Sequence, residues 1–162
     1  MLDIADAKRF ILAGNAYFTI ENGKAGDEYQ RFTFRVSKPD DNAASSVLDY
    51  YFVSVLTGPD NTKNYTYMGM LDGRHEQWQP NGGTFRETKG SKIRHDALSW
   101  KVFDWLMKYV YASHPLPNGY RLYHSGRCGR CGRQLTVPES IKAGIGPECR
   151  KAMGLTPLEG AN

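Results

Sequence analysis

The residues with the clearest chemical potential are concentrated between positions 124 and 149, where the sequence reads His-x3-Cys-x2-Cys-x17-Cys. The candidate metal ligands are His124, Cys128, Cys131 and Cys149, and they include every cysteine of the chain. Two thiolates separated by two residues can hold one tetrahedral ion from a single tight turn, while the more distant ligands complete its coordination. This spacing predicts a structural Zn²⁺ site.

The residues around the cysteines favour the local geometry that such a site needs. Gly129 lies between the paired cysteines and Gly132 follows them, and a residue that tolerates positive φ lets backbone N–H groups point at sulfur in such a turn. Pro147 predicts a helix start just before Cys149, where the helix dipole stabilises a thiolate. The paired cysteines and the third one therefore each have a suitable backbone setting.

Other interpretations of these residues stay open from the sequence. The three cysteines could be unrelated free thiols, or Cys128 and Cys131 could form a disulfide that leaves Cys149 unpaired. The fourth ligand could be His124, His114, Glu148 or a water molecule. We favour His124, because its offset of four residues from Cys128 matches short-range zinc-ligand spacing.

The positive charge of the chain is concentrated in the same segment. Residues 1–118 contain 14 basic and 14 acidic residues, whereas residues 119–154 contain seven basic and two acidic ones. A basic surface around a small metal core is typical of phosphate binding, although it can also simply keep a small module soluble. The candidate nucleic-acid-binding residues are Arg127, Arg130, Arg133, Lys142, Arg150 and Lys151.

The rest of the chain has the periodicity of an α+β protein. Apolar spacing predicts a short amphipathic helix over 3–13 and a long helix over 96–112 with Asp96 as its N-cap. We predict strands at 16–20 and 29–36, the second with strict alternation, and expect these two to form a hairpin. A further strand is predicted at 50–56, which is apolar on both faces, and it pairs with one at 65–71. We expect a polar loop at 40–46, and a mobile loop or irregular edge hairpin over 72–90, with Phe85 as a short-strand residue.

The prolines between 114 and 119 mark the predicted boundary between two units. Each proline lacks a backbone donor and restricts the residue before it, so the long helix cannot continue through them. We therefore predict a sheet domain over 1–113 with one long packing helix, a Pro-rich joint at 114–119, a treble-clef or ribbon-like zinc module over 120–154, and a tail at 155–162.

Three phrases of the predicted module carry a family resemblance. Gly-Arg-Cys-Gly-Arg-Cys-Gly-Arg at 126–133, Leu-Thr-Val-Pro-Glu-Ser at 135–140 and Gly-Ile-Gly-Pro-Glu-Cys at 144–149 resemble a small zinc-binding domain common in bacteriophage and bacterial proteins of uncharacterised function. Segments 10–16, 52–59 and 104–106 look like its companion domain. The resemblance implies zinc ligation by the three cysteines and, less directly, His124, in a phage or bacterial setting. It supplies no catalytic residue.

No pattern in the sequence indicates an enzyme. The His-x-Glu and Pro-Cys-x-x-Cys elements of nucleobase deaminases are absent, and no glycine-rich segment has the Lys-Ser or Lys-Thr ending of a P-loop. His95-Asp96 and Arg74-His75-Glu76 are the remaining polar clusters, and such clusters usually cap helices or lie on the surface. We predict a non-enzymatic protein.

Nucleic acid, DNA or RNA, is the partner that the basic module favours. Exposed tyrosines among Tyr50, Tyr51, Tyr65 and Tyr67 could stack on bases, although strand tyrosines more often pack one ring face against the protein. The alternative is a protein-binding module that inhibits or redirects a host factor, as in phage counter-defence. An acidic N-terminus, the lack of a long apolar run and the clustered cysteines predict the bacterial host cytoplasm.

Overall fold

The computed structural model describes residues 1–23, 30–39 and 49–156, and among them six strands form one antiparallel sheet. The order across the sheet is β5-β4-β3-β2-β1-β6. The strands are β1 (Asn15–Asn22), β2 (Gln30–Ser37), β3 (Tyr50–Leu56), β4 (Tyr65–Asp72), β5 (Phe85–Arg86) and β6 (Tyr120–His124). The predicted β1–β2 pairing is confirmed. The loop expected at 40–46 lies outside the described residues, as does the tail from 157 onwards.

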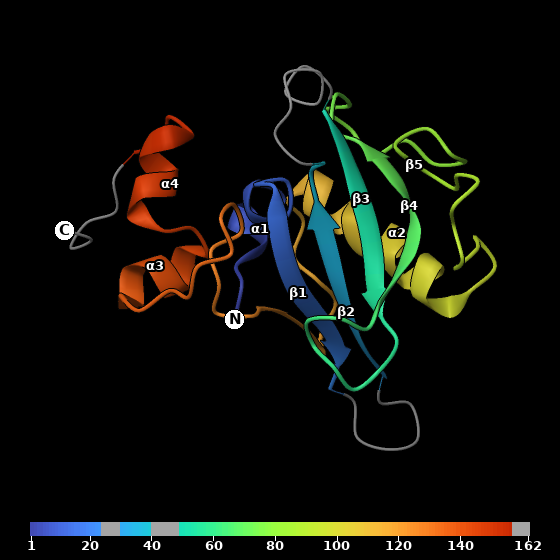
Figure 1. Cartoon of the computed structure of the whole chain (residues 1–162), viewed down its shortest axis with the longest axis horizontal. Coiled ribbons are helices and arrows are strands. Elements are labelled where there is room, and N and C mark those ends of the chain that lie inside the picture. Colours follow the sequence, from blue (N-terminus) through green and yellow to red (C-terminus); the bar gives the residue numbers. More distant parts are fainter. Residues whose placement is uncertain (24–29, 40–48, 157–162) are drawn as a thin grey trace.

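Two helices pack on one face of this sheet, α1 (Ile4–Ile11) and α2 (Leu98–Ala112). Figure 1 shows α2 running behind the strands. Because strand side chains alternate between faces, Phe18 and Phe34 point into the core while their neighbours point away. The Phe34 ring meets that of Phe103 from α2 at a centroid distance of 5.2 Å. The predicted α+β fold with one long packing helix is confirmed.

The start of α2 differs from the prediction. The helix begins at Leu98, its N-cap is Ala97, and no side chain caps it. Asp96 lies in the turn before the cap, which the hydrogen bond from Ala97 N to Arg94 O closes at 3.0 Å. The Asp96 carboxylate therefore stands one residue too early to serve as the N-cap. In α1 the residue before the helix does cap it, since Asp3 Oδ1 accepts from Ala5 N at 3.0 Å.

The edge strand β6 comes from the segment that we assigned to the zinc module. It pairs with β1 in antiparallel register, with Leu122 opposite Ile20, and both side chains are buried. An open edge at β1 would leave backbone donors and acceptors unpaired, and β6 satisfies them. The segment 120–124 is therefore part of the sheet. Whether residues 1–113 and 120–154 fold independently stays a prediction.

Beyond β6 the chain forms a hairpin and two short helices beside the sheet, α3 (Pro138–Ala143) and α4 (Pro147–Ala152) (Figure 1). Their contact with the sheet domain is close, because Asn15 N donates to Gly129 O at 2.7 Å. The sequence indicated α4 but not α3. None of the helices that the structure describes is both long enough and apolar enough to cross a membrane.

Candidate metal centre

The structure brings the three cysteines together. The Sγ atoms of Cys128, Cys131 and Cys149 all lie within 4.8 Å of one another, and none is in a disulfide. Two thiolates on one tetrahedral zinc ion lie about 3.8 Å apart, so a small contraction would place all three around a single ion. Cys128 and Cys149 are buried and Cys131 is exposed, so the group has one side open to solvent. These thiols could hold a metal ion.

Cys128 and Cys131 come from a hairpin turn that points backbone donors at sulfur. Cys128 N donates to Arg133 O at 2.8 Å, and Gly132 turns the chain with a φ of 78°. The Cys128 sulfur accepts from Gly146 N at 3.4 Å. Burial raises the pKa of Cys128, but backbone N–H groups of Cys131, Gly146 and Arg130 outweigh it, and the pKa falls below its usual value. The turn therefore stabilises a thiolate at Cys128.

Gly129 is required for a different reason from the one that we expected. Unlike Gly132, it does not have a positive φ. A Cβ atom on Gly129 would lie 2.7 Å from the ring of Phe10, and real Cβ atoms essentially never come this close to another heavy atom. Gly129 is therefore needed because α1 packs directly on the backbone of the turn.

The first turn of α4 supplies Cys149. Gly146 is the N-cap and Pro147 opens the helix, as the sequence predicted. Arg130 Nη1 lies 3.8 Å from the Cys149 sulfur. Burial, followed by interactions with the other two thiols, raises the pKa of Cys149 to about 11, although Arg130 opposes the rise. A cation among the three sulfurs would reverse this preference, because a coordinating thiol loses its proton.

His124 is not brought to the thiols. Its Nδ1 accepts from Gly126 N at 3.0 Å, and its Nε2 contacts Ile141 O. Burial lowers the pKa of His124, which favours a neutral ring that donates from Nε2 and accepts at Nδ1. Nε2 thus joins β6 to α3, while Nδ1 holds the turn that follows β6. In the described part of the chain, the group of possible ligands comprises the cysteines without His124.

The other candidates for the fourth ligand differ in their position. His114 is exposed near the end of α2, with its Nδ1 3.0 Å from Pro115 O. Glu148 is exposed and lines a cavity of about 480 Å³ together with the three cysteines. The thiol group lines this cavity on its open side, so water can reach it there. Glu148 lines the same cavity, but its carboxylate, like the His124 ring, is not in the group of possible ligands among the described residues.

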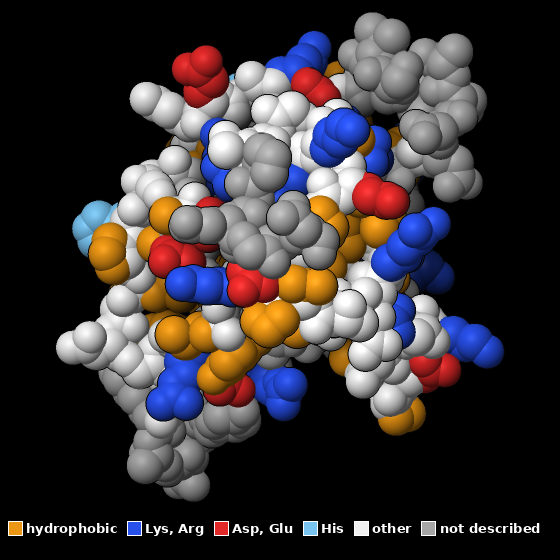
Figure 2. Space-filling view, turned by 90° about the vertical axis from the view of Figure 1, so that its left-hand side faces the viewer, with side chains coloured by type: hydrophobic (Ala, Val, Ile, Leu, Met, Phe, Trp, Pro, Cys, Tyr) orange, Lys and Arg blue, Asp and Glu red, His pale blue; other side chains and the backbone are white. Residues whose placement is uncertain are grey.

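Five of the six basic residues that we singled out are exposed, and Arg150 is not. Arg150 is buried, and its Nε and Nη2 atoms donate to Thr156 O at 3.1 and 2.8 Å. It therefore holds the chain after α4 and does not contribute to a binding surface. The exposed ones are Arg127, Arg130, Arg133, Lys142 and Lys151. Figure 2 shows this side of the molecule, where Lys and Arg side chains alternate with acidic and hydrophobic ones.

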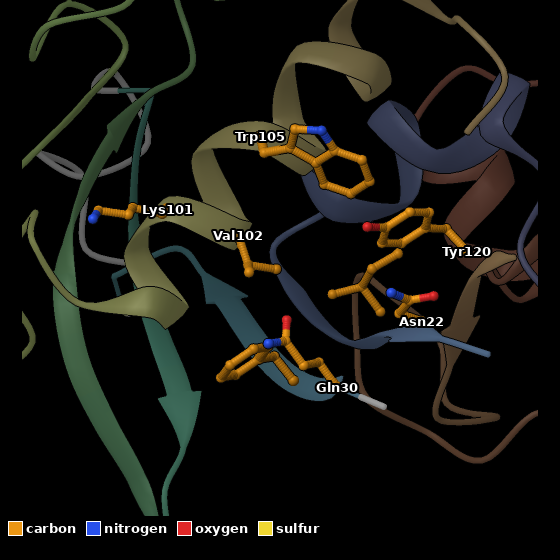
Figure 3. Close-up of a pocket in the computed structure, with 8 residues that line it drawn as sticks. Asn22, Gln30, Lys101, Val102, Trp105 and Tyr120 are labelled. Carbon is orange, nitrogen blue, oxygen red and sulfur yellow. The ribbon is translucent and has the colours of Figure 1, made fainter. Parts of the chain in front are cut away.

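A second cavity, of about 200 Å³, lies between α2 and the sheet. Val102 and Trp105 line it from the helix, and Asn22, Gln30 and Tyr120 line it from the strands (Figure 3). Lys101 extends away from the other labelled side chains. Besides Lys101 and the Tyr120 hydroxyl, the described lining consists of apolar side chains and amides, and it contains no carboxylate, histidine or thiol.

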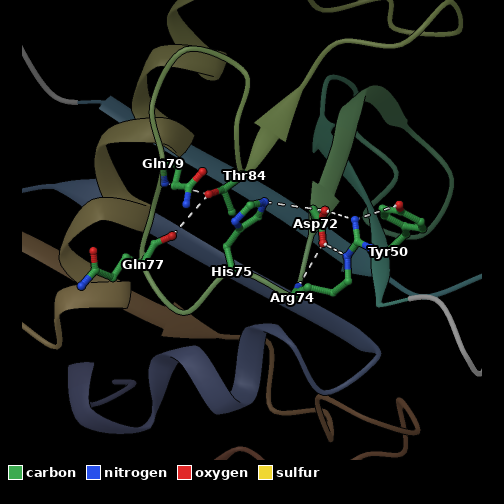
Figure 4. Close-up of polar contacts among 7 residues, drawn as sticks. All are labelled: Tyr50, Asp72, Arg74, His75, Gln77, Gln79 and Thr84. Carbon is green, nitrogen blue, oxygen red and sulfur yellow. Dashed lines mark hydrogen bonds and ion pairs between the residues drawn. The ribbon is translucent and has the colours of Figure 1, made fainter.

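In the cluster at Arg74-His75-Glu76, Arg74 forms an ion pair with Asp72 at the end of β4. Arg74 Nε and Nη2 lie 3.0 and 2.8 Å from the two carboxylate oxygens of buried Asp72, and Arg74 also reaches the Tyr50 hydroxyl (Figure 4). Hydrogen bonding from the Arg74 side chain lowers the pKa of Asp72 to about 2, although burial opposes this. His75 Nε2 is 3.7 Å from the same carboxylate. The carboxylate is neutralised and is not a poised base.

His95 is paired with Glu87. The backbone N–H and the ring Nδ1 of His95 both lie 2.6 Å from Glu87 Oε1, while Arg94 contacts the other oxygen at 3.1 Å. The His95 backbone N–H, then its ring, hold the pKa of Glu87 below its usual value. This is an exposed cluster that ties a loop to the start of α2, and it matches the surface role expected for this histidine.

Comparison with known protein families gives a match over the segment that contains the three cysteines. Residues 123–154 match a family model whose description is "Family of unknown function (DUF6011)". The match spans the hairpin, α3 and α4, and it leaves most of the sheet outside. No curated protein and no solved structure matches the chain. These findings agree with an uncharacterised small module at this end of the chain.

Proposed function

We propose that this protein is a non-enzymatic, zinc-dependent nucleic-acid-binding protein. Its three cysteines hold a structural Zn²⁺, and the ion fixes a set of exposed basic side chains for phosphate contact. The observation that carries the proposal is the convergence of three thiols from a hairpin turn and a helix start within 4.8 Å. Nothing else among the described residues gathers ligands in this way.

The donor set supports zinc over the other common ions. Thiolates are soft ligands, which Mg²⁺ and Ca²⁺ avoid, and a turn with two cysteines joined to a helix N-terminus suits a tetrahedral ion. Cys128 already receives a backbone hydrogen bond from Gly146, the kind of outer contact that orients a thiolate. We assign the fourth position to water.

Metal analysis of the purified protein tests the first half of the proposal. We expect about one zinc ion per chain under reducing conditions. Replacing Cys128 or Cys149 by serine should abolish stoichiometric zinc, while the control Ser140→Ala, at a residue that lines the same cavity, should retain it. A zinc content near zero in the reduced wild-type protein would reject the metal site.

Charge supports the second half. Residues 119–154 carry seven basic and two acidic residues. Arg127, Arg130 and Arg133 extend from the same hairpin as the ligands and are exposed, so the metal would fix their backbone. Because phosphate contacts release counterions, nucleic-acid affinity should fall steeply as salt rises.

Two triple variants with equal charge change locate the binding. Arg133→Gln, Lys142→Gln and Lys151→Gln together remove three exposed charges from the module, whereas Arg86→Gln, Lys89→Gln and Lys101→Gln remove three exposed charges elsewhere. We expect the module variant to weaken binding of labelled single- and double-stranded oligonucleotides at low salt, with a smaller salt slope, and the control to bind like wild type. Equal loss in both would show that net charge alone matters.

A protein partner is the competing hypothesis. It predicts no oligonucleotide binding even at low salt, and capture of a partner from bacterial lysate that survives nuclease treatment. Loss of the captured material after nuclease treatment would favour nucleic acid.

A further inference from the structure

The sheet has an outer face that no described helix covers. Helices α1 and α2 lie on the other face, behind the strands in Figure 1. On β1 and β2 the residues that point outward are those that alternate with the buried phenylalanines, such as Tyr17, Arg31 and Thr33. Alternation of this kind normally leaves one face of a sheet polar and solvated. Here the outer face carries tyrosine rings as well as arginines.

A cavity of about 350 Å³ lies on this outer face, and we call it the sheet-face groove. Asn61 and Thr62 from the β3–β4 loop border it on one side. The opposite side is the continuation of β6 into the metal-centre hairpin. The lining residues that matter for its chemistry are Tyr17, Arg31, Thr33, Tyr65, Tyr123 and Arg127.

Aromatic rings form part of the groove wall. The rings of Tyr17 and Tyr65 meet edge to face at a centroid distance of 5.5 Å, and both residues are only half-buried. The Arg35 guanidinium lies 5.3 Å from the Tyr17 ring centroid and is held there by Asn15. The Tyr17–Tyr65 pair is thus fixed in place while parts of its rings stay accessible, which suits stacking on a planar ligand.

The groove is also positively charged. Arg31 and Arg127 line it and are exposed, and none of the described residues that line it is acidic. Asp60 in the β3–β4 loop accepts from the backbone N–H groups of Thr62 and Lys63. Glu21 lies between Arg31 of β2 and Arg121 of β6 in the strand register, so two basic residues flank this one carboxylate. Burial, and then Tyr17, raise the pKa of Tyr65, while Arg35 and Arg127 oppose that rise, so both charges act on the Tyr65 hydroxyl.

We propose that the sheet-face groove binds a segment of single-stranded nucleic acid, with bases against Tyr17, Tyr65 and Tyr123 and phosphates at Arg31 and Arg127. This inference rests on the proposed function and gives it a location and a strand preference. A duplex keeps its bases stacked on each other, so it cannot use the tyrosines, whereas a single strand can. Arg127 belongs to the groove and precedes the ligand Cys128, so the metal would also set the groove's edge.

The signal for this groove was present in the sequence without being decisive. Arg31, Thr33 and Arg35 alternate with apolar residues in β2, which places them on one face. The sequence did not show that Tyr123 and Arg127, far along the chain, lie beside them.

Fluorescence anisotropy with labelled oligothymidylate, oligouridylate and a hairpin duplex tests the groove. Tyr65→Leu removes the ring, whereas Tyr65→Phe keeps it and removes only the hydroxyl. We expect Tyr65→Leu to weaken single-strand binding about 5- to 150-fold and Tyr65→Phe to bind nearly as wild type, because stacking needs the ring. Thermal unfolding of both variants shows whether the fold is intact.

An exposed charge provides a second, independent variant. Arg31→Gln should lower the salt slope by about 0.7, the value for one contact to a single strand, while the control Arg86→Gln, at the opposite edge strand β5, should not change it. Irradiation of bound oligonucleotides that contain 4-thiouracil should cross-link peptides with Tyr17, Tyr65 or Tyr123.

These experiments distinguish failure of the groove hypothesis from failure of the proposed nucleic-acid binding. If wild-type protein binds but Tyr65→Leu and Arg31→Gln do so equally well, or if cross-links fall only in α3 and α4, the groove is overturned and the module remains the binding surface. A preference for the duplex over both single strands also overturns it. If wild-type protein binds no oligonucleotide at low salt, the proposed function fails, and this inference falls with it.

Discussion

The ring of Phe10 on α1 packs against the backbone of Gly129 in the metal-centre turn, so closely that a Cβ atom there would lie 2.7 Å from the ring. Phe10 is fully buried, and its ring also meets His124 at a centroid distance of 5.5 Å. One aromatic side chain of the N-terminal helix therefore contacts the turn that carries two of the thiols and the strand that leads into it. The metal centre and the sheet domain share a core.

This contact predicts that Gly129→Ala destabilises the protein by about 1–3 kcal/mol through overpacking. Gly154→Ala is the control, because Gly154 has a φ of 72° but nothing within 4 Å of an added Cβ. It should cost about 1–2 kcal/mol from backbone strain alone. The test is a double-mutant cycle in urea: Phe10→Ala should reduce the cost of Gly129→Ala and leave that of Gly154→Ala unchanged. Additive costs for Phe10 and Gly129 would contradict the packing.

The contacts of His124 predict that it is not a metal ligand. His124→Ala should keep the zinc stoichiometry of the wild type, measured by competition with a chromogenic chelator, whereas Cys149→Ser should lose it. The same His124 substitution should lower the free energy of unfolding by about 1–3 kcal/mol, because Gly126 N and Ile141 O lose their partner. Loss of zinc from folded His124→Ala would restore the histidine to the site.

The ion pair between Asp72 and Arg74 predicts that the protein loses stability in a defined range of acidic pH. The pKa of Asp72 in the folded protein is about 2, below the value of about 3.9 for a free aspartate side chain. The ion pair therefore stabilises the fold fully above about pH 4. It loses this contribution as the pH falls from about 4 to 2. Asp72→Asn should therefore unfold at a lower temperature at neutral pH and show a flatter decline between pH 4 and pH 2. Asp6→Asn, at an exposed pair with Arg9, should leave the profile nearly unchanged.

Substitutions at two adjacent basic residues of α4, Arg150 and Lys151, should have different effects on stability and on oligonucleotide binding. Arg150 is buried and bonded to Thr156 O, whereas Lys151 is exposed. Arg150→Gln should lower the free energy of unfolding by about 1.5–3 kcal/mol, because hydrogen bonds of a charged group are lost. Lys151→Gln should leave stability nearly unchanged and weaken oligonucleotide binding. A wild-type unfolding midpoint for Arg150→Gln would show that its buried hydrogen bonds contribute little.

Local elements of this protein were predictable because their causes are local. A short run that is apolar on both faces indicated β3 at Tyr50–Leu56, and the spacing of Leu98, Trp105 and Leu106 indicated α2. The cysteine spacing likewise indicated the thiol group that the structure assembles. The exact helix starts were less predictable, since Asp96 is a good capping residue that the preceding turn displaces.

The sequence by itself determined the α+β class, the antiparallel hairpins and the three-cysteine group, because each follows from residue types within a short window. Only the tertiary structure decided which side chains are available. It places β6 in the sheet beside β1, buries Arg150, engages both nitrogens of His124, and brings Arg127 next to Tyr65. These outcomes depend on contacts between segments far apart in the chain, which compete for burial and hydrogen bonds in ways that no local pattern records.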